Sequence, residues 1–249
     1  MSKNPYEEDQ ILHDYLLFHY GKKEDILSDL FPVDWALDFP VKCITESLPE
    51  DLNNRENALD IGCSVGRSSF ELSKHFKNVV GVDYSHSFIE AANKMKLDGQ
   101  YPIRVKDHGS IYSHKTLKSP EACKPDRITF EQGDACNLKQ NSEKWDFVLA
   151  ANLLCRIPDP RKFLEEISFQ INSGGILALV SPYTWMTEYT SEENWIGGTD
   201  NSSSSKEAIK SLMYPSFELI KEQELPFLIR EHRRKYQLSS SHSTVWKKK

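Results

Sequence analysis

The sequence lacks several features that would assign it to a class at once. It has no run of about 18 apolar residues, as a membrane-spanning helix requires. Its start, MSKNPYEEDQ, has neither the basic region nor the apolar stretch of a signal peptide. The five cysteines form no CxxC or Cys/His spacing, which favours buried reduced thiols over a metal or redox centre. We therefore expect a cytoplasmic protein with no membrane attachment and no metal site.

A general excess of basic residues is also missing. The formal net charge is -6 and the pI is about 5.8, whereas nucleic-acid-binding domains usually carry a basic surplus. Basicity is instead local: from Ile229 to the C-terminus, seven Lys and Arg residues accompany one acid. The densest part is LIREHRRKYQ, residues 228–237, which we call the basic segment. On its own it fits a phosphate-binding patch, a solvated face or the wall of a pocket.

Short apolar runs alternate with helical patterns through most of the chain. Such alternation predicts an α/β fold with a parallel sheet covered on both faces. An amphipathic helix over residues 7–20, stopped by Gly21, precedes it, and residues 98–127 form a long insertion that could be a hairpin. We expect one compact domain, with a helical cap over 1–54 and a core over 55–249. The predicted strands are 58–62, 78–83, 128–134, 145–151, 175–181, 217–227 and 243–248.

The most informative segment is ALDIGCSVGRSSFELS, residues 58–73. A strand ends near Asp60, Gly62 and Gly66 permit a tight turn, and a helix begins near Arg67, so free backbone N–H groups point beyond the strand. Dinucleotide sites use G-x-G-x-x-G, but Ser64 stands where the middle glycine belongs. The pattern therefore disfavours a bound pyrophosphate.

Three aspartates end three successive predicted strands: Asp60, Asp83 and Asp134. Taken singly, each is more readily explained as a helix cap or turn residue. Because open α/β sheets bind ligands at the carboxyl ends of their strands, the three together predict a bound nucleoside. Asp83 would accept both ribose hydroxyls, and Asp134 would accept from an adenine amino group.

Several motifs resemble those of a known enzyme class. LDIGCSVG, GVDYS, EQGDA and GGILALVSP resemble the successive motifs of class I S-adenosylmethionine-dependent methyltransferases, over about residues 55–182. A longer series that includes YLLFHYG, LAANLLCRIPDPRKFL, SPYTWMTEYTSEENWIGG and the basic segment is similar to the 4-mercaptohistidine (5-thiohistidine) N-methyltransferase family of ovothiol biosynthesis, along nearly the whole chain.

The resemblance implies a Rossmann-like sheet of seven strands, mostly parallel with an antiparallel last strand. It implies S-adenosylmethionine as cofactor, S-adenosylhomocysteine as product, a small amino-acid substrate and no nucleic acid. It also implies functional pairing with a sulfoxide synthase domain or protein of the same pathway.

The resemblance assigns cofactor contacts residue by residue. The methionine part falls to Asp60, Gly62, Cys63 and Gly66, the ribose to Asp83, and the adenine to Asp134 with Ala135. Cys63 would act through its backbone, or simply fill the turn. The expected cofactor set is completed by Tyr84, Asn152, Tyr15 and Tyr20. For Tyr15, as for Phe18 and His19 of the same helix, plain core packing is an equal alternative.

The connections after strands four, five and six of such a sheet would cover the substrate. An arginine fork suits a carboxylate, for which Arg230, Arg233 and Arg234 are candidates, and Glu231 or Glu188 would hold the ammonium group. The expected substrate-binding residues are Arg156, Tyr183, Trp185, Glu188, Arg230, Glu231, His232, Arg233 and Tyr236.

Methylation of 5-thiohistidine on nitrogen poses a problem of regioselectivity, because the sulfur is the softer nucleophile. We expect Tyr183, Asn152 and His232 to be the catalytic residues, orienting the ring so that a nitrogen faces the methyl group. His232 would serve as a general base or, more simply, as a structural residue. Three alternatives stay open: a methyltransferase of another small amine, carboxylate or thiol; an RNA or protein methyltransferase; and a non-catalytic cofactor-binding scaffold.

Overall fold

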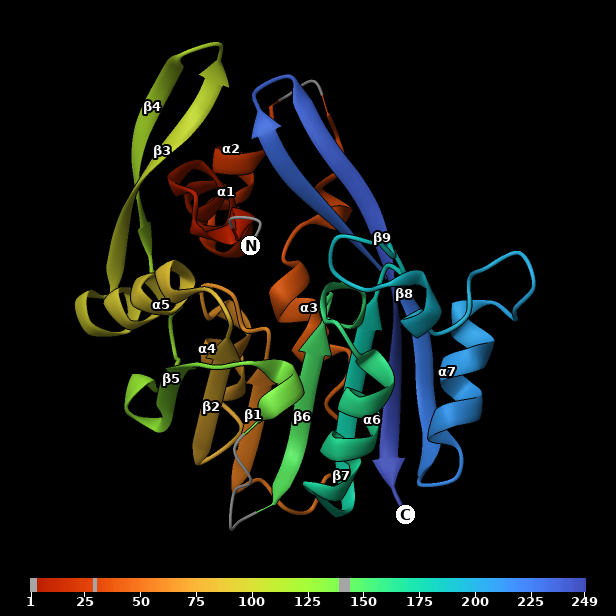
Figure 1. The fold of residues 1–249 in the computed structure, drawn as a ribbon. Helices are drawn as coiled ribbons and strands as arrows, with labels where there is room; N and C mark the ends of the chain where they lie inside the picture. Colours follow the sequence, from red (N-terminus) through yellow and green to blue (C-terminus); the bar gives the residue numbers. More distant parts are fainter. Residues whose placement is uncertain (1–3, 29–30, 139–143) are drawn as a thin grey trace.

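The protein is built around one central sheet. The computed structural model describes residues 4–28, 31–138 and 144–249. The sheet has the strand order β5-β2-β1-β6-β7-β9-β8, and β9 runs antiparallel to both of its neighbours (Figure 1). Its strands are β1 (Asn57–Ile61), β2 (Asn78–Asp83), β5 (Ile128–Gln132), β6 (Trp145–Ala151), β7 (Ile171–Ser181), β8 (Phe217–His232) and β9 (Lys235–Lys248). The predicted mostly parallel sheet with an antiparallel last strand is confirmed.

Helices cover both faces of this sheet (Figure 1). On one face α3 (Phe39–Thr45), α4 (Arg67–Leu72) and α5 (His86–Asp98) share a hydrophobic core with α1 (Asp9–Tyr20). The other face carries α6 (Pro160–Phe169) and α7 (Ser205–Met213). Because both faces are covered, β6 is buried along most of its length, as its continuous apolar sequence requires. No helix in the described ranges is long and apolar enough to cross a membrane.

The N-terminal helix ends where the sequence predicts. A side chain at position 21 would lie 2.5 Å from the carbonyl oxygen of Leu17, so the close approach at the end of α1 needs Gly21. Leu16 and Leu17 are buried in the same core as the sheet, and the ring of Phe18 lies 6.1 Å from that of Phe227 in β8. The N-terminal helices thus pack directly over the rest of the protein.

The insertion at residues 98–127 contains the predicted hairpin, formed by β3 (Gln100–His108) and β4 (Ile111–Lys118). It stands beside α1 and α2 (Lys23–Ile26), on the side opposite the β8–β9 hairpin (Figure 1). The Arg104 backbone N–H donates to His13 Nδ1 at 2.8 Å, and Lys115 forms an ion pair with Asp25. The hairpin therefore supports the N-terminal helices from one side.

The basic segment differs from its predicted form. It was expected to be the connection after a strand ending at residue 227, but β8 and β9 stay paired as far as His232 and Lys235. Cross-strand pairing continues through the charged residues because their long side chains can extend past the edge into solvent while the backbone ladder is kept. The segment is therefore the end of a long hairpin.

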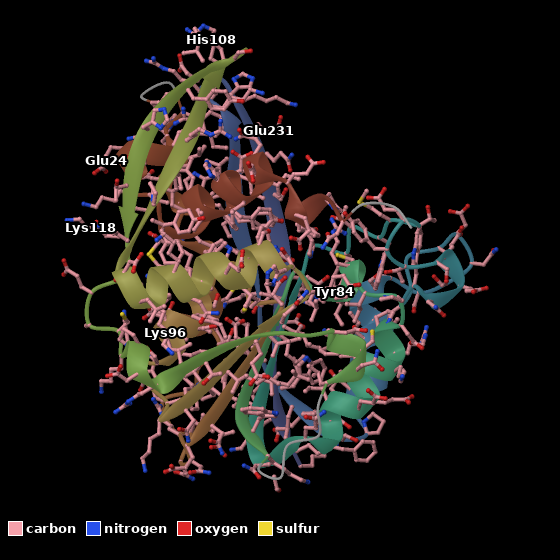
Figure 2. The ribbon with its side chains drawn as sticks, turned by 60° about the vertical axis from the view of Figure 1, so that its left-hand side comes forward. Glu24, Tyr84, Lys96, His108, Lys118 and Glu231 are labelled. Carbon is pink, nitrogen blue, oxygen red and sulfur yellow. The ribbon has the colours of Figure 1, made fainter. Side chains whose placement is uncertain are left out.

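Two side chains of the basic segment bind main-chain atoms. Arg230 donates to the carbonyl oxygens of Asp25 at 2.8 Å and Lys106 at 3.3 Å, and the Tyr236 hydroxyl donates to that of Ile26 at 3.2 Å. These bonds join the β8–β9 hairpin to α2 and to β3. Figure 2 shows Glu231 high on the molecule, near the hairpin ends and away from Tyr84 at the sheet edge.

We predict that Arg230→Ala lowers the free energy of unfolding by about 1–3 kcal/mol, because partly buried carbonyl groups lose a charged hydrogen-bond donor. Arg234, whose side chain is exposed and makes no hydrogen bond within the described ranges, supplies the control variant Arg234→Ala. Urea denaturation of both variants measures the difference. Equal midpoints would show that Arg230 does not join these segments.

Candidate functional site

Three residues with unusual backbone conformations lie at the carboxyl ends of neighbouring strands. Ser64 follows β1 with φ of 51°, Asn152 follows β6 with φ of 53°, and Tyr183 follows β7 with φ of 53°. A positive φ is unfavourable for residues other than glycine, and such strain persists mainly where function requires it. Their clustering marks this edge of the sheet as the candidate site.

The loop after β1 is held in a fixed shape by glycines and by β2. Gly62 and Gly66 have φ of 73° and 88°, and a side chain at Gly66 would lie 2.5 Å from the ring of Phe130. The backbone N–H groups of Gly62 and Cys63 both donate to the Val82 carbonyl, at 2.8 and 3.0 Å. The predicted tight turn is confirmed.

Asp60, near the end of β1, binds the helix that follows this loop. Its carboxylate accepts from the Ser69 hydroxyl of α4 at 2.6 Å and is buried, with 2% of its surface exposed. Burial, followed by the nearby charge of Asp83, raises the pKa of Asp60 from 3.8 to about 7. Since the carboxylate bonds to α4, the expected contact of Asp60 with the cofactor stays a prediction.

Asp83 joins two loops at the edge. Its two oxygens accept from the backbone N–H groups of Ser64 at 2.8 Å and of Ser85 at 2.9 Å. Burial raises the pKa of Asp83, while these bonds act in the opposite direction. Each oxygen still has a lone pair available, which suits a pair of ribose hydroxyls.

Tyr84 follows β2, and Asp134 lies just after the neighbouring strand β5. Asp134 caps a short 3-10 helix, accepting from the Cys136 backbone N–H and the Asn137 side chain, both at 2.8 Å. The side chain of Tyr84 is 67% exposed at the end of β2 (Figure 2). Asp134 therefore has the capping role that was its simpler explanation, and its adenine contact stays a prediction.

The edge also has polar atoms without partners. Among the described residues, Ser64 Oγ and His19 Nδ1 are buried and make no hydrogen bond. Burial lowers the pKa of His19 to about 3, so its imidazole is neutral. The neighbouring Tyr20 hydroxyl donates to the Val65 carbonyl at 2.7 Å and ties α1 to the loop. Unpartnered polar atoms beside a strained loop fit a site that a polar cofactor completes.

An arginine surrounded by tyrosines lies above the end of β6. Arg156 Nη1 donates to the carbonyls of Thr184 at 2.7 Å and Cys155 at 2.9 Å, and its guanidinium carbon lies 5.0 Å from the centre of the Tyr189 ring. The Tyr6 hydroxyl interacts with both Arg156 and Tyr189. Within the described part of the chain, no carboxylate lies at ion-pair distance from Arg156.

The phenols around Arg156 stay protonated. Burial, together with Tyr15, raises the pKa of Tyr6 to about 12. Burial, together with Tyr6, raises that of Tyr189 to about 12 as well. The Tyr15 ring lies 5.9 Å from that of Tyr6, so the predicted Tyr15 belongs to this group. Tyr6 and Tyr189 were not predicted, because their approach to Arg156 depends on how distant segments fold together.

Two further side chains at the edge are held by β9. The Ser241 hydroxyl donates to Asn152 Oδ1 at 2.7 Å, and the Tyr183 hydroxyl lies 2.7 Å from His242 Nδ1. Burial raises the pKa of Tyr183 well above its ordinary value, with the charges of Glu224 and Glu222 adding to the shift. Neither Ser241 nor His242 was among the site residues predicted from the sequence.

The other predicted substrate residues are less closely associated with this edge. Trp185 Nε1 donates to the Ser205 hydroxyl at 2.8 Å, and Glu188 is exposed. In the basic segment Glu231 pairs with Lys235, and Arg233 Nη1 lies 4.0 Å from Asp107. None of the segment's described side chains bonds to Asn152, Arg156 or Tyr183, so its part in substrate binding stays a prediction.

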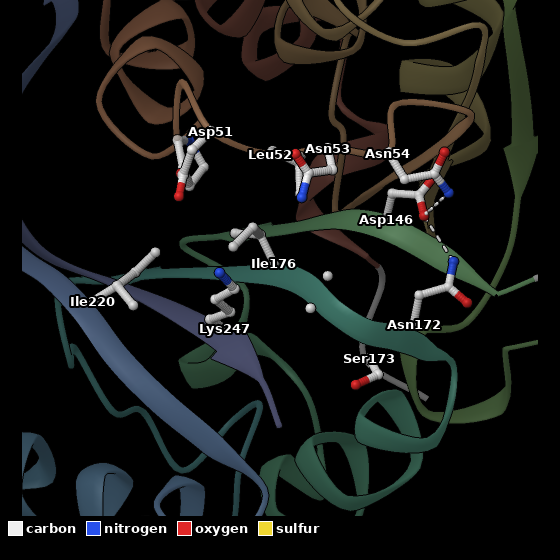
Figure 3. Close-up of a pocket in the computed structure, with 13 residues that line it drawn as sticks. Asp51, Leu52, Asn53, Asn54, Asp146, Asn172, Ser173, Ile176, Ile220 and Lys247 are labelled. Carbon is white, nitrogen blue, oxygen red and sulfur yellow. Dashed lines mark hydrogen bonds between the residues drawn. The ribbon is translucent and has the colours of Figure 1, made fainter.

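A hollow of about 500 Å³ lies at the opposite edge, near the start of β6 (Figure 3). There the Asp146 carboxylate accepts from the side chains of Asn54 and Asn172, each at 2.7 Å, and from the backbone N–H of Glu56 at 3.0 Å. These bonds occupy its carboxylate oxygens, so the group at the base of this hollow is structural. The carboxyl edge of the sheet, with its strained residues and unpartnered polar atoms, therefore remains the candidate site.

Comparison with known proteins indicates the class of enzyme that this chain resembles. Residues 59–179 match the family model described as a methyltransferase domain. A ubiquinone biosynthesis O-methyltransferase of Coxiella burnetii is 27% identical over 122 residues, which make up 49% of this chain and 42% of the relative. Methyltransferase GfsG of Streptomyces halstedii is 26% identical over 139 residues, 55% of this chain and 42% of the relative. The chain thus spans less than half the length of these curated relatives.

Solved structures share the fold. The N-methyltransferase NodS from Bradyrhizobium japonicum, in complex with S-adenosyl-L-homocysteine, gives a TM-score of 0.55 at 13% identity, over 97% of this chain and 99% of that chain. A methyltransferase from Methanosarcina mazei gives 0.53 at 18% identity, over 89% of this chain and 99% of that chain. The domain match and the shared fold support S-adenosylmethionine as the cofactor, and its placement at this edge stays a prediction. The narrower resemblance to the ovothiol family stays a prediction.

We predict that the contribution of Asp60 to the free energy of unfolding of the cofactor-free protein falls as the pH rises from about 4 to about 7, because folded Asp60 holds a proton that the unfolded chain has lost. Asp60→Asn keeps an acceptor for Ser69 and removes this titration, at about 1.4 kcal/mol per pKa unit. Urea denaturation at several pH values should show the variant gaining stability relative to the parent as the pH rises. A constant difference across this range would contradict a raised pKa.

We also predict that Asp83→Ala raises the dissociation constant of S-adenosylhomocysteine by about 10- to 100-fold, the usual effect of losing hydrogen bonds to a charged group. Asp126, exposed in the connection before β5, provides the control Asp126→Ala. Isothermal titration calorimetry gives both constants, and thermal melting checks that the variants are folded. Unchanged affinity in folded Asp83→Ala would exclude the ribose contact.

Proposed function

We propose that the methyltransferase domain of this chain transfers a methyl group from S-adenosylmethionine to an imidazole ring nitrogen of 5-thiohistidine. The observation that carries the proposal is Arg156, a half-buried cation with no carboxylate partner in the described structure. A cation in such a place is costly unless an anion joins it. An amino-acid substrate supplies that anion in its carboxylate group.

The surroundings of Arg156 suit a carboxylate better than the basic segment does. The Thr184 carbonyl fixes the guanidinium plane through Nη1, which leaves other donor nitrogens for the substrate. The protonated phenol of Tyr6, which accepts from Tyr189 and Arg156, adds one donor beside it. Arg230, by contrast, already donates to main-chain carbonyls of α2 and β3. We therefore assign the carboxylate to Arg156.

The chemistry asks the protein mainly for orientation. The bound cofactor supplies a methyl group on a sulfonium centre, and the protein's residues hold the acceptor nitrogen in line with it and exclude water. Such positioning contributes roughly 7–11 kcal/mol to catalysis. Asn152 and Tyr183 lie at the edge with their side chains fixed, and we assign them to the ring. His232 accepts from the Arg234 backbone N–H at the end of the hairpin, which favours its structural explanation.

The expected product distinguishes this proposal from methylation of another small nucleophile. We predict that, with ¹³C-methyl-labelled S-adenosylmethionine, the enzyme methylates 5-thiohistidine on a ring nitrogen and acts weakly on histamine, which lacks the carboxylate. Two-dimensional NMR locates the new methyl group. Methylation on sulfur, or turnover only with unrelated phenols, amines or thiols from the same panel, would overturn the proposal.

A variant tests the arginine separately. Arg156→Gln should raise KM for 5-thiohistidine by about 10- to 100-fold, through loss of a charged hydrogen bond, with little change in S-adenosylhomocysteine affinity. Arg233→Gln, which alters an exposed arginine of the basic segment, should leave KM unchanged. The reverse result would return the carboxylate to the basic segment.

A further inference from the structure

Two consecutive residues of β9 hold the two side chains that project from the ends of β6 and β7. Ser241 binds Asn152 and His242 binds Tyr183, both at 2.7 Å. Side chains alternate between the faces of a strand, so the two residues act on opposite faces of the same edge. Both are buried, with 0% and 6% of their surfaces exposed, and neither has a place in the proposed function so far.

We propose that Ser241 and His242 are positioning residues that set the hydrogen-bond polarity of the methyl-transfer site. They make Asn152 a donor and Tyr183 an acceptor toward the substrate. The inference rests on the proposed function, because it pairs the Asn152 donor with the sulfur of a thioimidazole and the Tyr183 acceptor with its ring N–H.

The Asn152 amide has one acceptor and two donor positions. The Ser241 hydroxyl donates to its oxygen, so Nδ2 is left to donate elsewhere. A donor directed at the substrate binds the thiolate sulfur and lowers the availability of the sulfur lone pairs for attack. In the structure the Ser241 hydroxyl is the donor in this contact, which holds the amide with Nδ2 free.

The Tyr183 hydroxyl has the opposite role: it is available to the substrate as a hydrogen-bond acceptor. Its raised pKa keeps it protonated, and in the proposed arrangement it donates its proton to His242 Nδ1, which lies 2.7 Å away. The oxygen lone pairs then face outward and can accept from the protonated ring nitrogen of the substrate. The other ring nitrogen, which carries no proton, keeps its lone pair for the methyl group.

The charges around His242 maintain this arrangement. Burial, and then Lys206 and Lys210, lower the pKa of His242, whereas Glu224 and Glu222 act in the opposite direction. With Nδ1 accepting from Tyr183, the ring proton lies on Nε2, which is 3.9 Å from Glu222 Oε2 and has no hydrogen-bond partner among the described residues. Glu222 itself is held by Lys210 at 2.7 Å and Lys206 at 3.0 Å.

The test compares two serine variants of β9, one at a residue that bonds to Asn152 and one at a residue that does not. Ser241→Ala frees the Asn152 amide and should lower kcat for nitrogen methylation by about 10- to 100-fold, the effect of one hydrogen bond to a charged group, and should yield S-methylated product. Ser243→Ala is the matched control, because this buried hydroxyl on the same face has no partner in the described structure. It should keep the parent's kcat and product.

His242 is tested by rescue. His242→Leu removes the acceptor for Tyr183 and should lower kcat, whereas His242→Asn retains an acceptor near the Nδ1 position and should recover most of the activity. In a Tyr183→Phe background, His242→Leu should have little further effect if the two act as a pair. Thermal melting confirms folding of each variant. Equal losses in His242→Leu and His242→Asn, both folded, would overturn the proposal.

One measurement is independent of the substrate. The ¹⁵N chemical shifts of His242 in the parent protein should show the Nε2–H tautomer, and the Nδ1–H tautomer would contradict the proposed polarity. If the parent methylates no thioimidazole while the tautomer is as expected, the proposed function fails and the assignment of polarities to the substrate fails with it. If nitrogen methylation is observed and Ser241→Ala equals Ser243→Ala, only the present inference fails.

Discussion

The hydrogen bonds to Asp83 are the interaction on which the rest of the site depends. Its two oxygens join the loop after β1 to the start of the helix after β2 through Ser64 and Ser85. The same helix start receives the N-terminal segment, since the Glu7 carboxylate accepts from the backbone N–H groups of His86 at 2.9 Å and Ser87 at 3.2 Å. One buried carboxylate therefore joins the loop after β1 to the helix start that also binds the N-terminal segment.

Much of the fold and part of the site follow from local sequence. The strands that contain Asp60, Asp83 and Ala151 are short apolar runs between helical patterns. Gly62 and Gly66 predict the tight turn between β1 and α4. Such features depend on neighbours within a few residues. That is why the β1 loop and the position of Asp83 could be predicted from the sequence alone.

The parts that were missed depend on contacts between distant segments. The prediction that β8 ends at residue 227 was wrong, because the charged residues that follow favour a loop by local composition. Cross-strand pairing of β8 with β9 continues through them. Ser241 and His242 belong to a polar stretch of β9 whose neighbours Asn152 and Tyr183 lie 89 and 59 residues away in the chain. Tyr6 reaches Arg156 only because α1 folds over the sheet.

Positive charge is used in two ways in this protein. Arg230 binds the carbonyl groups of adjoining segments and stabilises the cap, although the sequence suggested a ligand for it. Arg156 lies among phenols with a carbonyl fixing its plane and no acid beside it in the described structure. A crystal structure with S-adenosylhomocysteine and 5-thiohistidine would test this distinction directly. We expect the substrate carboxylate at hydrogen-bond distance from Arg156 and an unprotonated ring nitrogen facing the cofactor sulfur. A carboxylate held by Arg233 or Arg234, or a substrate sulfur facing the cofactor, would contradict it.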